Sequence, residues 1–128
     1  MNQSTSILWL AVLAAAGAYA QGPSQPNSDQ TPIVEVVGCL SPADAGWVLT
    51  KASEPAVAPT SFTTPEAVKA AAEKPLGTEQ YRLLGAGSFS PESHKGQKMV
   101  VRGLLIKSTS NARINLTSFQ MLAETCTR

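Results

Sequence analysis

The chain has 128 residues, with 10 Lys and Arg against 9 Asp and Glu and a formal net charge of +1. This balance excludes a strongly basic nucleic-acid-binding arm and an acidic tail as the main feature. The length leaves room for one domain and not for two, and nine prolines, nine glycines and only 15% charged residues favour a turn-rich β domain over a helical bundle.

The N-terminal segment has the layout of a cleaved secretory signal. An apolar core covers residues 7–16, and Ala18-Tyr19-Ala20 supplies the small residues that a signal peptidase recognises. The core is shorter than the about 20 apolar residues that a spanning helix needs. An uncleaved anchor stays an alternative, because no Lys or Arg precedes the core. We expect a signal peptide over 1–20, a disordered polar linker over 21–32 and an exported domain over 33–128.

Two strands are expected at the start of this domain, over 33–40 and 47–51, joined into a hairpin by the turn residues 41–46. In the first strand, Val34, Val36 and Leu40 face one way and the intervening residues face the other. Gly38 lies inside this strand and predicts a bend or a bulge.

The segment 53–78 interrupts the β pattern. Pro55 and Pro59 predict a loop over 54–61. Thr63, followed three positions later by Glu66, predicts a helix start, and the Ala-rich run after it ends before Pro75. Because this helix has few apolar side chains to bury, we expect it to be a surface decoration.

The strand pattern then resumes. A short strand is predicted over 81–84, a one-turn helix over 90–96 with Ser90 as its cap, a long strand over 98–107, and a last strand over 113–122. The alternation of the last strand changes phase, which predicts a bulge near Thr117 or Ser118.

This order of elements predicts an all-β fold: a small five-stranded OB-like Greek-key barrel, with the short helix between strands 3 and 4. The partly helical insertion 53–78 falls between strands 2 and 3. The first and fourth strands are expected to be the longest, and each carries an internal glycine, Gly38 or Gly103, where a barrel corner is needed. An open five-stranded sandwich is the alternative.

Several short motifs occur in a consistent order along residues 34–126. They are Val37-Gly38-Cys39-Leu40, Trp47-Val48-Leu49-Thr50, Tyr81-Arg82-Leu83-Leu84-Gly85, His94-Lys95-Gly96, Val101-Arg102-Gly103-Leu104 and a final strand that ends near Cys126. This arrangement resembles small exported bacterial proteins of unknown function with an OB-fold-like domain. The resemblance implies the fold and export; that family has no established activity to carry over, and the 53–78 insertion departs from its simplest form.

The chain has two cysteines, Cys39 at the end of the first strand and Cys126 after the last. In an OB-like barrel these strands run in the same direction, so both cysteines reach one end of the molecule. Export into an oxidising compartment then favours a disulfide. Two free buried thiols or a reactive pair are the alternatives; with a single histidine the cysteines make a poor metal-ligand set.

The candidate ligand face consists of Tyr81, Lys98, Arg102, Lys107 and Arg113. No acidic residue occurs between Glu92 and Glu124, so the basic residues on adjacent strands predict a basic stripe. OB-folds bind oligonucleotides and oligosaccharides on one face. A solvated face with ordinary solubility charges explains the same residues. Because few aromatic residues are left for base stacking, an envelope protein or an anionic glycan is favoured over nucleic acid.

No catalytic residue, metal site or cofactor is predicted. His94, the only histidine, is expected to have a structural role at the end of the short helix. The function predicted is a non-enzymatic, exported OB-like binding or interaction module, with contacts from the 53–78 insertion, the 41–46 turn and the outer face near Tyr81. The alternatives are a structural cell-envelope protein without a small ligand and an unrecognised hydrolase that uses His94.

Overall fold

The computed structural model describes residues 32–108 and 111–127. The predicted signal peptide over 1–20, and the linker over 21–32 except its last residue, lie outside the described residues. Strands make up about half of the described residues, against one short α-helix, which confirms the all-β class. The elements in chain order are β1 (Ile33–Ala43), β2 (Gly46–Ala52), β3 (Ala56–Val57), α1 (Pro65–Ala72), β4 (Glu79–Leu84), η1 (Ala86–Phe89), η2 (Pro91–His94), β5 (Lys98–Ile106) and β6 (Arg113–Ala123).

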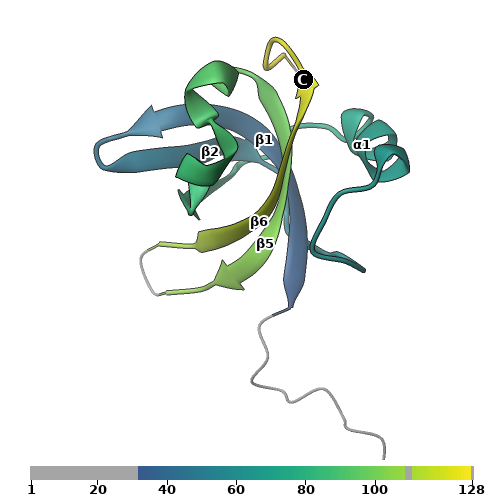
Figure 1. Cartoon of the computed structure of the whole chain (residues 1–128), viewed down its shortest axis with the longest axis horizontal. Coiled ribbons are helices and arrows are strands. Elements are labelled where there is room, and N and C mark those ends of the chain that lie inside the picture. The colour runs from purple at the N-terminus through teal and green to yellow at the C-terminus, as the bar shows by residue number, and fades with distance from the viewer. Residues whose placement is uncertain (1–31, 109–110, 128) are drawn as a thin grey trace, which may run out of the picture.

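The strands form one mixed sheet that closes into a ring (Figure 1). Neighbours follow the order β2-β4-β6-β5-β1-β3, and a further pairing of β1 with β2 closes the ring. β4 and β6 are parallel, whereas the other pairs are antiparallel. The predicted strand number of five was wrong. A sixth strand, β3, pairs with β1 inside the segment where Pro55 and Pro59 predict a loop.

The registers place the strand termini at two ends of the ring. The β5–β6 connection lies at one end, together with the starts of β1 and β4 and the end of β2; we call this end the mouth. At the other end, η1 and η2 close the ring, and Ala86 and Phe89 pack on its core. The predicted one-turn helix is η2, with Ser90 at its N-cap position, but Ser90 lies in the left-handed region and makes no side-chain cap hydrogen bond. The 3-10 turn η1 before it was not predicted.

The alternation of β1 sorts its side chains between two hydrophobic clusters. Val34, Val36 and Leu40 point into the ring, as predicted, and join the main core with Leu49, Met99 and Ile114. Val37 points outward and is fully buried as well. The outer side of this strand is therefore covered by another part of the chain.

That cover is α1. Ala71 of the helix is fully buried against Val37 and Val100, with Val68, Leu76 and Leu122 around them. The prediction that the helix is only a surface decoration was wrong, because small alanines let it approach the sheet closely enough to bury both valines. Its N-cap is also one residue later than predicted, since the Thr64 hydroxyl accepts from the Ala67 N–H at 3.2 Å.

The predicted bulge in the last strand is confirmed. Arg102 of β5 pairs with Ser118, whereas Gly103 pairs with Leu116, so Thr117 is the extra residue. Because of this extra residue, Leu116 before it and Phe119 after it both point into the ring and join the main core. The predicted strand lengths were only partly right: β1 and β6 have 11 residues each and β5 has nine.

Gly103 allows the two long strands to approach each other at this bulge. A Cβ atom built there would overlap the carbonyl oxygen of Asn115, a backbone atom that cannot move alone. We expect Gly103→Ala to lower the free energy of unfolding by about 1–3 kcal/mol, the usual cost of overpacking. The control is Gly87→Ala, where an added Cβ meets nothing within 4 Å. Equal urea midpoints for the two variants would contradict this assignment.

The predicted disulfide is present. Cys39 and Cys126 are joined, with their Cα atoms 5.6 Å apart and 87 positions apart in the sequence. The bond ties the end of the chain back to β1 at the end of the ring opposite the mouth.

Candidate functional site

The structure does not bring the five residues of the candidate ligand face together on one surface. Lys98 and Arg102 are buried, each only 4% exposed. Tyr81 belongs to the main core. Lys107 and Arg113 lie at the mouth, on either side of the β5–β6 connection. The predicted basic stripe is therefore divided: Lys98 and Arg102 are buried in the structure, whereas Lys107 and Arg113 lie at the mouth.

Lys98 lies under the C-terminal end of α1. Its ammonium group donates to the carbonyl oxygens of Ala72 and Lys74, at 3.2 and 2.8 Å. The last carbonyls of a helix lack partners within the helix and carry a partial negative charge, so a buried lysine is stabilised there.

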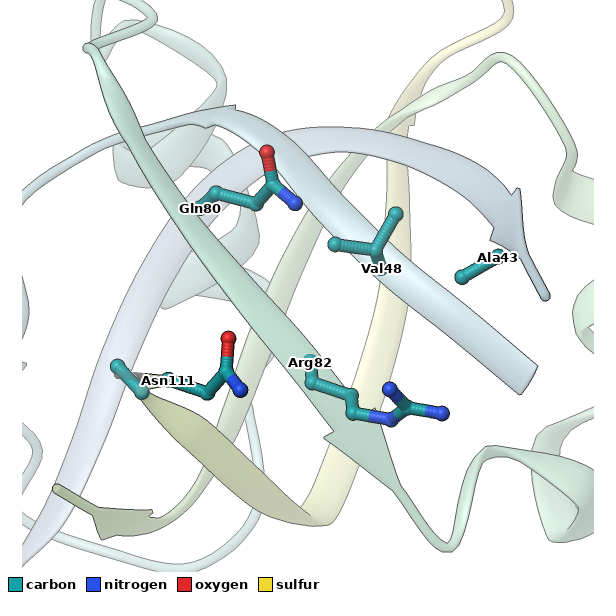
Figure 2. A pocket seen from close by; sticks show the side chains of 6 residues that line it. Ala43, Val48, Gln80, Arg82 and Asn111 are labelled. Atoms are coloured by element: carbon teal, nitrogen blue, oxygen red, sulfur yellow. The ribbon is translucent and has the colours of Figure 1, made fainter. Parts of the chain in front are cut away.

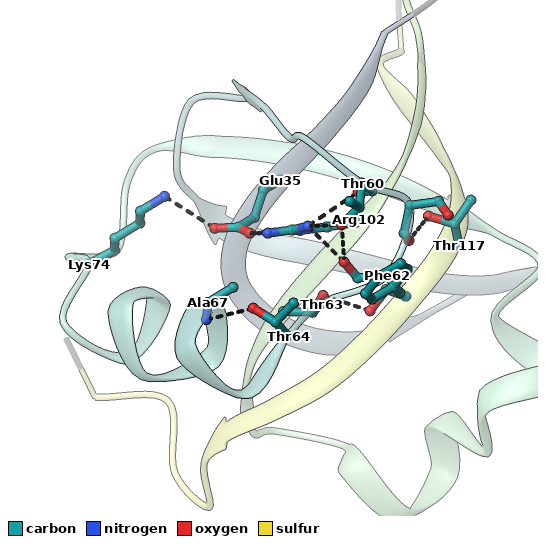
Figure 3. Close-up of polar contacts among 11 residues, drawn as sticks. Glu35, Thr60, Phe62, Thr63, Thr64, Ala67, Lys74, Arg102 and Thr117 are labelled. Atoms are coloured by element: carbon teal, nitrogen blue, oxygen red, sulfur yellow. Dashed lines mark hydrogen bonds and ion pairs between the residues drawn. The ribbon is translucent and has the colours of Figure 1, made fainter.

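Arg102 holds a second part of the 53–78 segment against the outer side of the sheet (Figure 3). Its guanidinium contacts Glu35 Oε2 through Nε and a terminal nitrogen, both at 2.8 Å. On its other side it donates to the backbone carbonyls of Thr60 and Phe62, at 3.2 and 2.7 Å. We call residues 60–63 the strap. Arg102 therefore pins the strap rather than facing solvent.

Arg102 also donates to the Thr60 hydroxyl at 2.9 Å, and two hydroxyl groups of the β6 bulge contact the strap as well. Thr117 donates to the Ser61 carbonyl at 2.6 Å, and the hydroxyls of Ser118 and Thr63 lie 2.6 Å apart. Lys74 pairs with the second oxygen of Glu35 at 3.2 Å. The strap and α1 together cover the outer side of β1, β5 and β6, which leaves the outer side of β2 and β4 open.

A hollow of about 340 Å³ lies on that open side, and we call it the outer hollow (Figure 2). Its lining residues are Ala43, Val48, Gln80, Arg82, Asn111 and Ala112. Gln80 and Arg82 point outward because they alternate with the inward Tyr81 and Leu83 of β4. None of the residues that line this hollow is acidic.

Arg113 does not line the outer hollow but lies beside it, next to Arg82. It is the register partner of Arg82 in the parallel β4–β6 ladder, and because its neighbour Ile114 points into the core, Arg113 faces outward like Arg82. Its Nε is buried and has no hydrogen-bond partner. Like charges directly opposite each other in a sheet are destabilising. An anion placed between the two guanidinium groups would remove this repulsion.

A second hollow, of about 530 Å³, lies at the mouth, and we call it the mouth hollow. Its lining residues are Glu54, Pro55, Glu79, Tyr81, Leu105, Lys107, Ser108 and Ala112. Burial raises the pKa of the Tyr81 hydroxyl, and the negative charges of Glu79 and then Glu54 raise it further. The phenol therefore stays protonated at neutral pH.

His94 contacts two side chains instead of the helix-end carbonyls that were predicted as its partners. Its Nδ1 lies 2.7 Å from the side-chain oxygen of Gln97, and its ring meets Phe119 edge-on at 5.5 Å. In residues 32–108 and 111–127, no three His, Cys, Asp or Glu side chains are grouped to hold a metal ion. No helix in this part of the chain is long and apolar enough to cross a membrane.

Comparison of the chain with protein-family models, curated proteins and solved structures finds no match. The site must therefore be judged from its own residues. Sequence reasoning did not single out Gln80, Arg82 or Asn111 as site residues. The alternation of Tyr81-Arg82-Leu83 is the signal that could have identified Arg82, because it fixes that side chain on the outer side of the strand.

Proposed function

We propose that this protein is an exported, non-enzymatic binding module of OB-like architecture. The ring order β1-β2-β4-β6-β5 supports the OB-like part of the proposal, as do η1 and η2, which lie between β4 and β5 in the chain. β3 is then an addition made by the 53–78 insertion. The Cys39–Cys126 bond supports export, because such bonds persist in oxidising compartments. The resemblance to small exported bacterial proteins belongs to this same proposal.

The ligand we propose is an anionic glycan bound at the outer hollow. The observation that carries this is the pairing of Arg82 with Arg113 on the open side of the ring, with a buried, unpartnered Nε and no acidic residue lining the hollow. In OB-folds, the face of the second and third strands and the neighbouring loops bind extended polymers. Here that face is the β2–β4 side.

The other lining residues favour a glycan over a nucleic acid. Gln80 and Asn111 carry amides, which offer both donors and acceptors to sugar hydroxyls. No aromatic residue lines the outer hollow, whereas single-stranded nucleic acids are held largely by stacking on aromatic side chains.

The test is a titration of the protein with three probes: an oligogalacturonate, a neutral maltooligosaccharide and a single-stranded DNA oligonucleotide. We expect the oligogalacturonate to bind most tightly and to shift the amide signals of Gln80, Arg82 and Asn111. Each change, Arg82→Gln or Arg113→Gln, should weaken it about tenfold or more, because a hydrogen bond to a charged group contributes about 1.5–3 kcal/mol. Raising the ionic strength from ~0.01 M to ~1 M should weaken binding further, since the Debye length falls from about 30 to 3 Å.

The matched control is Lys69→Gln, which removes one exposed positive charge on α1, an element that packs over β5 and β6 rather than over β2 and β4. Equal loss in this control would show that net charge alone is responsible. Tighter binding of DNA would show that the ligand is a nucleic acid and not a glycan. Binding of none of the three probes would favour a structural envelope protein or one that binds another envelope protein.

A further inference from the structure

The mouth hollow has a chemistry opposite to that of the outer hollow, although the two share Ala112 and lie on opposite sides of β4. The alternation of β4 separates them: Gln80 and Arg82 point outward, whereas Glu79 and Tyr81 face the mouth hollow. Its volume of about 530 Å³ falls within the range of about 300–1,000 Å³ that is usual for small-molecule sites.

Tyr81 is the first observation that points to a ligand. Its side chain packs in the main core and the residue is only 3% exposed, yet it lines the hollow. Within the described residues its hydroxyl forms no hydrogen bond. The hydroxyl itself is not buried: among the described residues Arg113 Nε is the one buried side-chain N or O atom without a partner, so the phenol oxygen is accessible from the hollow. This hydroxyl therefore offers an unfilled position at the surface of the hollow.

The two carboxylates of the hollow are the second observation. Among the described residues, neither Glu54 nor Glu79 forms an ion pair or a hydrogen bond, although Lys107 lines the same hollow. Both act electrostatically on the Tyr81 hydroxyl, so their charges lie near it. A protonated amine suits this surrounding: it can donate to both carboxylates and to the phenol oxygen, and an aromatic ring also attracts cations.

We propose that the mouth hollow binds a small ligand through a primary ammonium group, held by Glu54, Glu79 and the Tyr81 hydroxyl. Pro55 and Leu105 supply apolar surface for the carbon chain next to the ammonium. This site is separate from the anion-binding function proposed for the outer hollow and does not depend on it.

The test is an NMR titration of the 15N-labelled protein with butylammonium, with butanol and butanoate as matched probes. Butylammonium should shift the signals of Glu54, Glu79 and Leu105 and leave those of Gln80 and Arg82 unchanged. Glu79→Gln should weaken binding about tenfold or more, and Tyr81→Phe, which removes only the hydroxyl, about three- to tenfold. Glu66→Gln, which neutralises an exposed acid of α1, is the control and should leave binding unchanged.

Equal affinity for butanol would show that the hollow selects only for apolar carbon and would overturn the proposal. Tighter binding of butanoate would overturn it too, because Lys107 would then dominate. If Tyr81→Phe does not fold, Glu54→Gln provides the second variant, since Glu54 is exposed and contributes to no core cluster. Shifts confined to the outer hollow would likewise count against this site, without affecting the test of the anionic glycan.

Discussion

Replacing Cys39 and Cys126 by serine is expected to lower the free energy of unfolding by about 4–5 kcal/mol. The reason is that a cross-link spanning nearly the whole domain reduces the conformational entropy of the unfolded chain, and the variant lacks this restriction. The bond joins residues 87 positions apart, so the loop that it closes in the unfolded chain contains most residues of the ring. A domain of this size has a total stability of about 5–15 kcal/mol. The double variant should therefore unfold at a much lower urea concentration.

Chemical reduction of the unchanged protein is the control for the serine substitutions. Cys39 is buried, and a serine hydroxyl there adds a desolvation cost that reduction does not. Reduced protein should lose most of the same stability, and reoxidation should restore it. An unchanged urea midpoint after reduction would show that the ring holds its two ends together without the bond.

The hydrophobic pattern was sufficient to predict the ring strands. Val34, Val36 and Leu40 alternate with period two, and this pattern alone fixes which side of β1 enters the core. The phase change in β6 likewise predicted a bulge near Thr117 or Ser118, because a strand that keeps one buried face can change phase only by an extra residue. The structure places it at Thr117. Both predictions depend on contacts that are periodic along the chain.

The buried charges could not be predicted in this way. Arg102 finds its carbonyl partners 40 and 42 positions away, in a segment without periodicity, so no local pattern shows that the strap crosses the sheet there. Lys98 is buried for the same reason, by the end of α1. A basic residue in a strand looks solvent-exposed until the element that covers it is known.

The arginines at the outer hollow could be predicted only in part. The outward direction of Arg82 follows from the alternation of β4, but its pairing with Arg113 requires the parallel β4–β6 ladder. That ladder joins segments separated by η1, η2 and β5, so it is a property of the ring order and not of either strand. The predicted ligand face therefore included Arg113 but not Arg82.

Replacing Arg102 by methionine is expected to lower the free energy of unfolding by about 3–5 kcal/mol, the usual cost of removing one partner from a buried ion pair. The Arg102 side chain is 5% exposed and that of Glu35 is 11% exposed. Without the guanidinium, Glu35 would keep only Lys74, and the carbonyls of Thr60 and Phe62 would lose their shared donor. Urea unfolding measures the effect.

Arg82→Met is the matched control: the same chemical change at an exposed arginine on β4, which β6 separates from β5 in the sheet. It should alter the free energy of unfolding by no more than about 0.5 kcal/mol. The double variant Glu35→Leu, Arg102→Met should be more stable than Arg102→Met alone, because it leaves no uncompensated buried carboxylate.

Hydrogen exchange separates a local role of Arg102 from a global one. If Arg102 mainly pins the strap, the amides of residues 58–63 should exchange faster in Arg102→Met even under conditions where the ring stays folded. The amides of β5 and β6 should then keep their protection. Equal loss of protection in both parts would show that the strap and the ring unfold as one unit, and that the guanidinium stabilises the whole sheet through Glu35 of β1.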